Sequence, residues 1–331
     1  MKIKEVADRL KISQRAIRFY EDKGLIAPSK RDDNQYRMFD EKDIWRLQTI
    51  IALRESGMSV SDIRTALPEV EAQENGQLRY FLELQRSVMF SKWVEMKQII
   101  ETTDKMIESL KNNQGLPLDD IYTLAEGSRR LREQRAWEDK WGFDRLASIH
   151  DRLVQEDKRK YRDYDEALRL IVKWVSPIPG ERGLDVGTGT GNLAGRLVHE
   201  GAVMAGVDQS NEMLKECQRK FPEVETKLGN FLALPYLDGK FDFVVSSFAL
   251  HHLTSEQTLM AIQEMRRVLK PHGRICVADL MIDGEGGAVI EDDAEYIPLI
   301  ELINLFEDKG YITKHLKINE LLHVVLAVPI R

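Results

Sequence analysis

Three glycines alternate with threonines directly after a short apolar stretch that ends near an acidic residue. The run Asp185-Val186-Gly187-Thr188-Gly189-Thr190-Gly191 precedes a helical pattern from Asn192, and a second apolar stretch ends in Asp208. Glycines at a strand-to-helix turn let the backbone approach a ligand, and an acidic residue after the next strand can accept from ribose hydroxyls. The sequence therefore predicts a βαβ nucleotide-binding unit.

The type of nucleotide depends on the residues around the glycines. Counted from Gly187, a dinucleotide pattern needs a glycine where Asn192 stands. Counted from Gly189, Ala194 can be the last small residue, so a dinucleotide remains an alternative at this point. The Gly-Lys-Ser/Thr of a phosphate-binding P-loop does not occur in the sequence. Asp185, two residues before the glycines, favours a cationic ligand over a pyrophosphate.

Three further segments follow in order: GNFLALPY (229–236), FDFVVSSFALHHL (241–253) and EMRRVLKPHGRICVADL (264–280). Together with the glycine run they closely resemble class I S-adenosylmethionine-dependent methyltransferases, especially the small-molecule branch that includes UbiE and YrrT-type proteins. The resemblance covers residues 137–331. It implies an α/β, Rossmann-like domain with S-adenosylmethionine as its cofactor and a small molecule as its methyl acceptor.

The resemblance also assigns cofactor-binding residues. Asp208 would bind the ribose, Asn230 and Phe231 would flank the adenine, and Ser246 to Phe248 would face the cofactor. Asn230 replaces the family's usual Asp, which keeps an acceptor for the adenine amine but removes a charge. The family's aromatic-Asp pair appears here as His150-Asp151. The methionine portion would lie against Asp185, Gly187, Gly189 and Gly191.

Methyl transfer from a sulfonium is an in-line displacement, to which an enzyme contributes mainly alignment and desolvation. A base is needed only when the acceptor must lose a proton, and an imidazole titrates near neutral pH. His251 and His252 are the candidates, and we take His251 as the catalytic residue. The alternative is that one histidine caps the following helix and the other packs. Tyr161 and Tyr164 could line a substrate pocket or simply pack on a helix face.

The first seventy residues carry a different pattern. Residues 4–10 have helical spacing, Ser13 can cap a helix that starts at Gln14, and Gly24 can end it. Two short helices joined by a tight turn form a helix-turn-helix unit, whose second helix lies in the major groove of DNA. The planar side chains that suit base edges and phosphates are Gln14, Arg15 and Arg18.

A turn-rich segment at 28–39 predicts a hairpin wing, and helices are expected from 41 to 56 and from Ser59. The run IRFYEDKGLIAPSKRDDNQYRMFDEKDIWRLQTIIALRESGMSVSDIRTAL resembles the winged-helix domain of MerR-family transcription regulators, and the resemblance covers residues 1–70. It implies binding to double-stranded promoter DNA. Gln35 stands where the family usually has Gly, so the wing turn can differ. Arg15 and Arg18 would belong to the recognition helix, and the phosphate contacts would come from Tyr20, Arg31, Tyr36 and Arg37.

Between these regions, residues 76–112 predict one long helix. Leu82, Met89, Met96, Thr103 and Leu110 recur every seven residues, which is coiled-coil spacing. MerR-like proteins dimerise through such a helix, and a two-fold DNA site requires a two-fold protein, so we expect a homodimer. The alternative is that the stripe packs on the C-terminal domain of the same chain. Residues 113–136 begin with a helix-breaking run and predict a linker.

Composition disfavours other classes of protein. The longest apolar stretches are strand-sized, far short of the ~20 residues of a membrane helix, and the charged start MKIKEVADRL predicts no secretory signal. Cys217 and Cys276 lack close partners in the sequence, which argues against a disulfide scaffold or a metal site and fits a reducing cytoplasm. Residues 1–37 carry ten Lys/Arg and six Asp/Glu, whereas the chain has a net charge of −7. A basic N-terminal segment in an otherwise acidic chain suits a protein in which only that segment binds a polyanion.

Three functions remain open. The first is a MerR-type regulator whose methyltransferase domain modifies a small molecule; the second is a pure regulator that uses a silent methyltransferase fold as a ligand sensor. The third is a methyltransferase whose helix-turn-helix serves another purpose. DNA methylation is disfavoured because residues 246–248 are Ser-Ser-Phe rather than Asn/Asp-Pro-Pro-aromatic, and a Pro-Cys nucleophile is missing from the sequence. The expected domains are a winged helix at 1–70, a dimerisation helix at 76–112, a linker at 113–136 and an α/β methyltransferase domain at 137–331.

Overall fold

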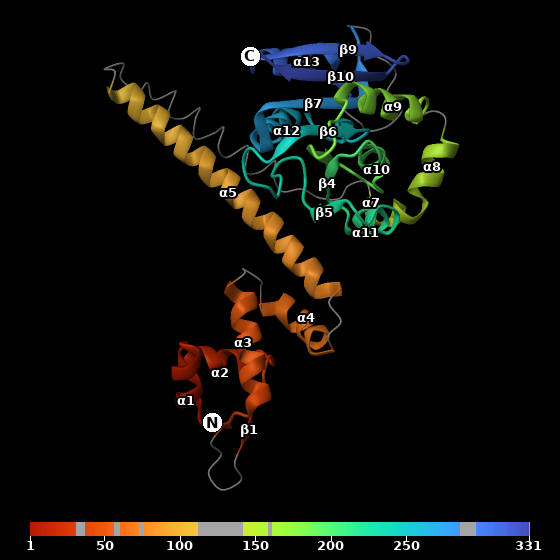
Figure 1. The fold of residues 1–331 in the computed structure, drawn as a ribbon. Helices are drawn as coiled ribbons and strands as arrows, with labels where there is room; N and C mark the ends of the chain where they lie inside the picture. Colours follow the sequence, from red (N-terminus) through yellow and green to blue (C-terminus); the bar gives the residue numbers. More distant parts are fainter. Residues whose placement is uncertain are drawn as a thin grey trace. The chain divides into compact units, whose positions relative to one another are not determined.

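The structure is a computed structural model that describes residues 1–30, 37–55, 60–72, 76–111, 142–157, 161–284 and 296–330. The chain divides into two compact units, Met1–Arg86 and Ser87–Arg331, which are described separately (Figure 1). The expected linker at 113–136 lies outside the described residues. None of the described helices is both long enough and apolar enough to cross a membrane.

The first unit is helical with a small hairpin, as the sequence predicts. Ser13 caps the second helix, because its Oγ accepts a hydrogen bond from the Ala16 N–H at 3.1 Å. Strands β1 and β2 pair antiparallel, and a shared apolar core lies between the helices, with Ile17 and Leu47 fully buried. The elements are α1 (Ile3–Leu10), α2 (Gln14–Asp22), β1 (Ser29–Lys30), β2 (Arg37–Met38), α3 (Glu41–Glu55) and α4 (Val60–Ala72).

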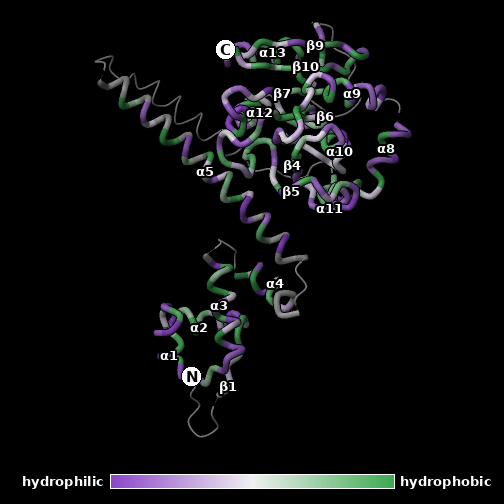
Figure 2. The backbone as a smooth tube through the Cα atoms, in the orientation of Figure 1, coloured by the Kyte–Doolittle hydropathy of each residue, from purple (hydrophilic) through white to green (hydrophobic). Residues whose placement is uncertain are grey.

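A single long helix, α5 (Gly76–Lys111), follows. Hydrophobic positions recur along its length in Figure 2. Side chains of the expected seven-residue stripe are exposed, with Met89 at 48% and Met96 at 61%, whereas Val94 on another face is 5% exposed. The described residues of the seven-residue stripe are therefore exposed in this chain, and their pairing with a second helix stays a prediction.

The second unit contains an α/β sheet, which confirms the expected fold class. Five parallel strands run in the order β5-β4-β3-β6-β7, and β10 and β9 extend the sheet antiparallel beyond β7. A short strand, β8 (Ile297–Pro298), also pairs with β7. The others are β3 (Arg182–Val186), β4 (Val203–Asp208), β5 (Glu225–Leu228), β6 (Phe241–Ser247), β7 (Leu269–Ile282), β9 (Tyr311–Lys317) and β10 (Leu322–Pro329).

Helices cover both faces of this sheet, because its central strands are apolar on both sides. One face packs against α9 (Tyr164–Val175), α10 (Asn192–His199) and α11 (Asn211–Lys220). The other face packs against α12 (Ser255–Val268) and α13 (Leu299–Glu307). The carboxyl ends of β3, β4 and β6 meet at one edge, where the strand order reverses direction. A crevice at such a point is the usual ligand site of an open α/β sheet.

Short helices before the sheet complete the unit. They are α7 (Phe143–Leu146), the 3₁₀ turn η1 (Ala147–Ile149) and α8 (His150–Glu156), and α7 and η1 pack against α11. A second 3₁₀ turn, η2 (Leu250–His252), follows β6. These short elements close the sides of the crevice.

Candidate active site

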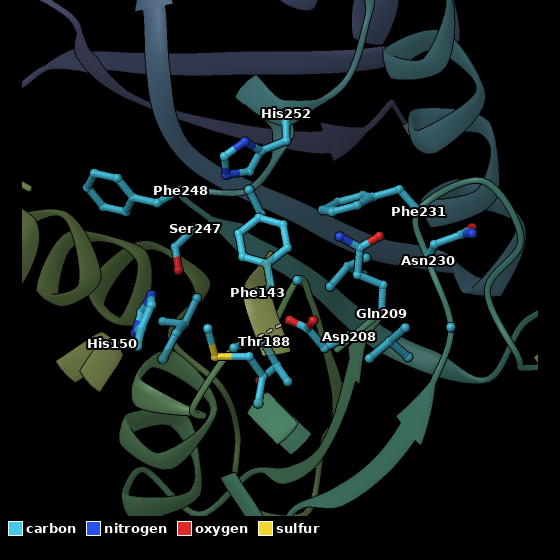
Figure 3. A pocket seen from close by; sticks show the side chains of 18 of the residues that line it. Phe143, His150, Thr188, Asp208, Gln209, Asn230, Phe231, Ser247, Phe248 and His252 are labelled. Atoms are coloured by element: carbon cyan, nitrogen blue, oxygen red, sulfur yellow. Dashed lines mark hydrogen bonds between the residues drawn. The ribbon is translucent and has the colours of Figure 1, made fainter. Parts of the chain in front are cut away.

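A pocket opens at the carboxyl ends of β3, β4 and β6 (Figure 3). Its floor is the glycine run after β3 and the end of β4, and its walls come from α7, α8, the segment after β5 and the segment after β6. Carbon-rich and aromatic side chains dominate the walls. The labelled lining residues in Figure 3 are Phe143, His150, Thr188, Asp208, Gln209, Asn230, Phe231, Ser247, Phe248 and His252.

The glycine run turns tightly beneath the pocket. Gly187, Gly189 and Gly191 all have φ between +53° and +85°, a region that residues with a side chain rarely adopt. A Cβ on Gly187 would lie 2.5 Å from the Cβ of Ala249, and one on Gly191 would lie 2.5 Å from Cys217 Sγ. Gly187 and Gly189 line the pocket, whereas Gly191 precedes α10 and packs on α11. Glycine is thus required here by backbone conformation and by packing.

Asp208 lies at the centre of the pocket floor in Figure 3. Its Oδ2 accepts a hydrogen bond from the Gly189 N–H at 2.8 Å, and its Oδ1 accepts from the Ser210 N–H at 2.9 Å. Burial raises the pKa of this carboxyl above its ordinary value, and the two backbone donors oppose that shift. The two backbone bonds fix the Asp208 carboxyl group in the pocket floor, and its role in ribose binding stays a prediction.

Asp185 and Ser246 are not among the residues that line the pocket, whereas Ser247 and Phe248, from the same expected stretch as Ser246, are. Asp185 is buried under the glycine run, where its Oδ2 accepts from the Thr188 hydroxyl at 2.8 Å, and it is not part of the pocket wall. Ser246 is fully buried and donates to the Val186 carbonyl at 2.8 Å. Because successive strand residues face opposite sides, Ser247 lines the pocket instead. Asp185 and Ser246 support the site without facing the ligand.

The segment after β5 forms one wall of the pocket. Asn230 and Phe231 line it, as expected, but the Asn230 Oδ1 already accepts from the N–H groups of Leu232 and Ala233 at 3.0 and 3.2 Å. Its amide NH₂ is therefore the group left for a ligand. Gln209 also lines the pocket, and its buried Oε1 has no hydrogen-bond partner among the described residues. The sequence analysis missed Gln209, although its position directly after Asp208 was a usable signal.

Two carboxylates hold the short helices α7 and α8 over the pocket. Asp144 Oδ1 accepts from the Ser210 hydroxyl at 2.6 Å, which ties α7 to the start of α11. Asp151 accepts from the Thr190 hydroxyl and from Lys220 Nζ, each at 2.6 Å, and from Asn192. The pKa of Asp151 is far below its ordinary value; its neighbour His150 has the largest effect, burial opposes it, and Lys220, Thr190 and Asn192 lower it further. These bonds position Phe143 and His150 in the pocket wall.

The two adjacent histidines have different surroundings. His251 is 1% exposed, its Nδ1 lies 2.6 Å from Asp279 Oδ1, and it is not part of the pocket wall. Asp279 also accepts from the N–H groups of Ala249 and Leu250, so this pair holds the segment after β6 in place. His252 lines the pocket, with its ring edge-on to Phe143 at 5.1 Å. Of the two candidates, His252 is thus among the residues that line the pocket and His251 is not, and the catalytic role of either stays a prediction.

An aromatic cluster forms the wall beside His150. The rings of Tyr161, Tyr164 and Phe248 lie 5.0 to 6.0 Å apart between centroids. Phe248 has a φ of +51°, which turns the chain away from β6 and brings its ring to the pocket. Burial raises the pKa of Tyr161 to about 12, so its hydroxyl stays protonated at neutral pH. Both tyrosines line the pocket, and their rings also pack together. Lining a pocket and packing, the two roles considered for them, are therefore compatible.

The first unit places its candidate DNA-binding residues on α2 and β2. Arg15 and Arg18 are exposed on α2, and Gln14 and Tyr20 are partly exposed. Arg37 on β2 instead forms an ion pair with Glu21, with Nε and Oε2 2.5 Å apart. Arg31 and Tyr36, which were expected to contact phosphates, lie outside the described residues.

The pocket fits S-adenosylmethionine better than a dinucleotide. None of the residues that line it is a lysine or an arginine, so a pyrophosphate would have no cationic side chain to pair with. Gln209 presents an unpaired buried acceptor, Asp208 presents a carboxylate, and aromatic rings surround the remaining space. A sulfonium cation and a ribose are compatible with these groups.

Comparisons with known proteins agree with both halves of this description. Residues 1–70 match the MerR HTH family regulatory proteins, and residues 184–273 match the family described as methyltransferase domain. An uncharacterized methyltransferase of Bacillus pumilus is 30% identical over 202 residues, which span 56% of this chain and 94% of that protein. The YrrT uncharacterized methyltransferase of Bacillus subtilis is 28% identical over 207 residues, covering 56% of this chain and 95% of the relative.

Among solved structures, a 1,6-didemethyltoxoflavin-N1-methyltransferase of Burkholderia thailandensis with bound S-adenosylhomocysteine is 20% identical, with a TM-score of 0.45. The match covers 56% of this chain and 85% of that one. The cofactor of the domain is S-adenosylmethionine, and the chain belongs to the class I, YrrT-like methyltransferases, with a MerR-type helix-turn-helix domain at residues 1–70.

Proposed function

We propose that the protein is a DNA-binding transcription regulator of the MerR type whose C-terminal domain transfers a methyl group to a small molecule. The observation that carries the second half is the pocket itself, which joins a ribose-binding carboxylate, Asp208, to a wall with an imidazole, His252. The first half rests on the match of residues 1–70 to MerR regulators and on the exposed arginines of α2.

S-adenosylmethionine supplies an electrophilic methyl group on a sulfonium. The residues of the chain position this group and the acceptor. Asp208 and Gln209 hold the nucleoside end, and the glycine run lets the methionine end lie against the backbone. Phe143, Tyr161 and Phe248 exclude water from the reacting end, which favours an in-line displacement because the charge is dispersed in the transition state.

His252 is the proposed general base for acceptors that must lose a proton. Its imidazole lines the pocket next to Ser247 and Phe143, and an imidazole titrates close to neutral pH. Tyr161 is a poor alternative, because its raised pKa keeps the hydroxyl protonated. An acceptor that attacks with a free lone pair and has no proton to lose would need no base, only alignment with the methyl group.

We also propose that the protein is a homodimer through α5. Met89, Met96 and Ile100 expose an apolar stripe on this helix, and a stripe with seven-residue spacing is buried by a second parallel or antiparallel helix. A second copy is the preferred partner because operators of helix-turn-helix dimers have two-fold symmetry. Sedimentation of the Met96→Glu variant tests this: it should be monomeric at micromolar concentration, whereas Asp104→Lys, an exposed position on the same helix that lies outside the seven-residue seam, should remain a dimer.

One experiment separates an enzyme from a ligand sensor. The purified chain is incubated with S-adenosylmethionine labelled in its methyl group and with a filtered extract of small metabolites. An active enzyme moves label into extractable molecules, and the Asp208→Ala variant does not. If the wild-type chain binds S-adenosylhomocysteine by calorimetry but moves no label, the domain acts as a sensor and the enzymatic proposal is wrong.

DNA binding is tested by selection from random duplexes followed by fluorescence anisotropy. The wild-type chain should enrich a two-fold symmetric sequence. Arg18→Ala should weaken binding to that sequence about 10-fold, because one charged contact to a base or a phosphate is worth roughly 1–3 kcal/mol. Failure to enrich any sequence would contradict the regulator half of the proposal alone.

A further inference from the structure

One face of α5 lies against the methyltransferase sheet unit through two charged contacts. Lys97 Nζ lies 2.9 Å from Asp238 Oδ2, and the guanidinium of Arg267 lies 4.8 Å from the ring centroid of Trp93. Val94, next to Trp93, is buried. All of these residues belong to the unit Ser87–Arg331. The contact attaches the long helix to the domain that holds the cofactor pocket.

Asp238 ends a loop that begins at the pocket. Gly229, Asn230 and Phe231 line the pocket wall, and the chain then runs through Leu234 and Tyr236 to Asp238. Phe231 lines the pocket at one end of this loop, and Asp238 contacts α5 at the other. The two residues are seven positions apart in the sequence. The pocket wall and the contact with α5 can influence each other through this loop only if other bonds keep the loop from bending freely.

Arg267 and Glu264 of α12 supply that connection. Arg267 donates to the carbonyls of Leu234 and Tyr236 at 3.0 and 2.7 Å, and to Asp238 Oδ1 at 2.9 Å. Glu264 accepts from the Leu234 N–H at 2.9 Å and from Arg267 at 2.7 Å. The second half of the loop, at Leu234, Tyr236 and Asp238, is therefore hydrogen-bonded to one ion pair.

The ion pair is buried, with Glu264 4% exposed. A buried ion pair tolerates the loss of one partner poorly, because the remaining charge has no solvent to stabilise it. Burial opposes the ionisation of Asp238, but Lys97 and Arg267 together lower its pKa, so the carboxylate stays charged and paired. Asp238 is thus bonded to the same guanidinium as Leu234 and Tyr236, so a movement of this part of the loop would also move Asp238.

The docked face of α5 differs from its exposed apolar stripe. Val94, which is buried, and Met96, which is exposed, are two residues apart and therefore lie on different sides of α5. Trp93 is four residues after Met89 and three before Met96, so it lies at the border between the docked face and the exposed stripe. A second copy of the chain can therefore bind the stripe while the helix remains docked on its own methyltransferase domain. The helix would then contact both the pocket domain and the dimer partner.

We propose that Asp238, held by Arg267 and bound by Lys97, couples cofactor occupancy of the pocket to the docking of α5. Adenine binding against Asn230 and Phe231 stabilises the arrangement of the loop 229–238 in which Asp238 meets Lys97. Coupling between sites is reciprocal, so docking of α5 also tightens cofactor binding. The inference rests on the proposed dimeric regulator, in which α5 joins the pocket to the DNA-binding end of the chain.

The test measures hydrogen exchange of α5 and cofactor affinity on the same full-length protein. Saturating S-adenosylhomocysteine should slow amide exchange in residues 88–100 about 5-fold, the lower end of typical coupling. Lys97→Met and Asp238→Asn should remove this slowing and weaken S-adenosylhomocysteine binding by the same factor. Lys270→Met is the matched control: its ammonium pairs with Asp242 at 2.7 Å and is similarly exposed, but this pair does not involve the loop or α5.

The outcomes distinguish the two proposals. If S-adenosylhomocysteine binds but exchange in α5 is unchanged, or if Lys270→Met behaves like Lys97→Met, the coupling is overturned and the proposed function is unaffected. If calorimetry detects no binding to folded protein, the proposed function fails and the coupling fails with it. Slowing in the wild-type chain and in Lys270→Met, together with its loss in Lys97→Met and Asp238→Asn, supports the coupling.

Discussion

The carboxylate of Asp151 at the start of α8 lies 2.6 Å from the ammonium of Lys220, the last residue of α11. The two residues are 69 positions apart in the sequence. Lys220 also donates to the Thr190 hydroxyl at 3.1 Å and to Asn192 Oδ1 at 2.6 Å, so one cation joins α8, the glycine run and α11. Lys220 thereby fixes α8, the helix whose first residue, His150, lines the pocket.

Replacing Lys220 by Met should weaken binding of S-adenosylhomocysteine by about 3- to 10-fold. The change removes the shared cation while keeping the aliphatic stem, and both partners are partly exposed, so the effect is smaller than for a fully buried pair. Isothermal titration measures it. Lys215→Met is the control, because Lys215 is on the same helix and pairs only with Glu212 one turn away. Equal affinities of Lys220→Met and wild type would contradict the role of Lys220.

Asp185 should make the stability of the cofactor-free protein depend on pH. Burial raises its pKa from 3.8 to about 7, the Thr188 hydroxyl partly offsets this, and the charge of Asp208 raises it further. A carboxyl whose pKa is raised in the folded state contributes stability below pH 3.8 and loses it as pH rises to about 7. The free energy of unfolding of the wild type minus that of Asp185→Asn should therefore fall from pH 5 to pH 7. Urea titrations at each pH measure the difference, and a constant difference would rule out this assignment.

His251 and His252 should respond differently to substitution by Gln. His252→Gln should lower the rate of methyl transfer to proton-bearing acceptors and leave stability nearly unchanged, because the ring lines the pocket. His251→Gln should instead lower the free energy of unfolding by roughly 1.5–3 kcal/mol, the usual value of a hydrogen bond to a charged group, because Asp279 loses its buried partner. Thermal unfolding and the label-transfer assay separate the two effects. A stable but inactive His251→Gln would show that our proposal of His252 is wrong.

Glu21→Gln should strengthen DNA binding. Glu21 pairs with Arg37 at 2.5 Å, and removing its charge frees the guanidinium to contact a phosphate. Each added phosphate contact steepens the dependence of log K on log salt by about 0.9. Asp22→Asn removes the same charge from the neighbouring residue and is the matched control. Anisotropy titrations at several salt concentrations should show the steeper slope for Glu21→Gln alone; identical slopes for both variants would indicate only a change in net charge.

Local patterns account for most of the fold and part of the site. The Ser13 cap, the α/β class and the succession of β3, the glycine run, α10 and β4 depend on neighbouring residues, because turns, caps and helical spacing are short-range features. Asp208 was found for the same reason, since it directly ends a strand. Gln209 has only its position next to Asp208 as a signal, and its amide could equally have faced solvent.

The sequence alone determined the two kinds of domain, the class of cofactor and the long helix, because these follow from motifs whose residues are close in the chain. The tertiary structure decided which of two adjacent residues lines the pocket: Ser247 and not Ser246, and His252 and not His251. It also decided the pairs Asp151–Lys220 and Asp238–Lys97. Strand alternation reverses with a shift of one residue, and ion pairs between distant segments form only after the sheet order and helix packing bring them together.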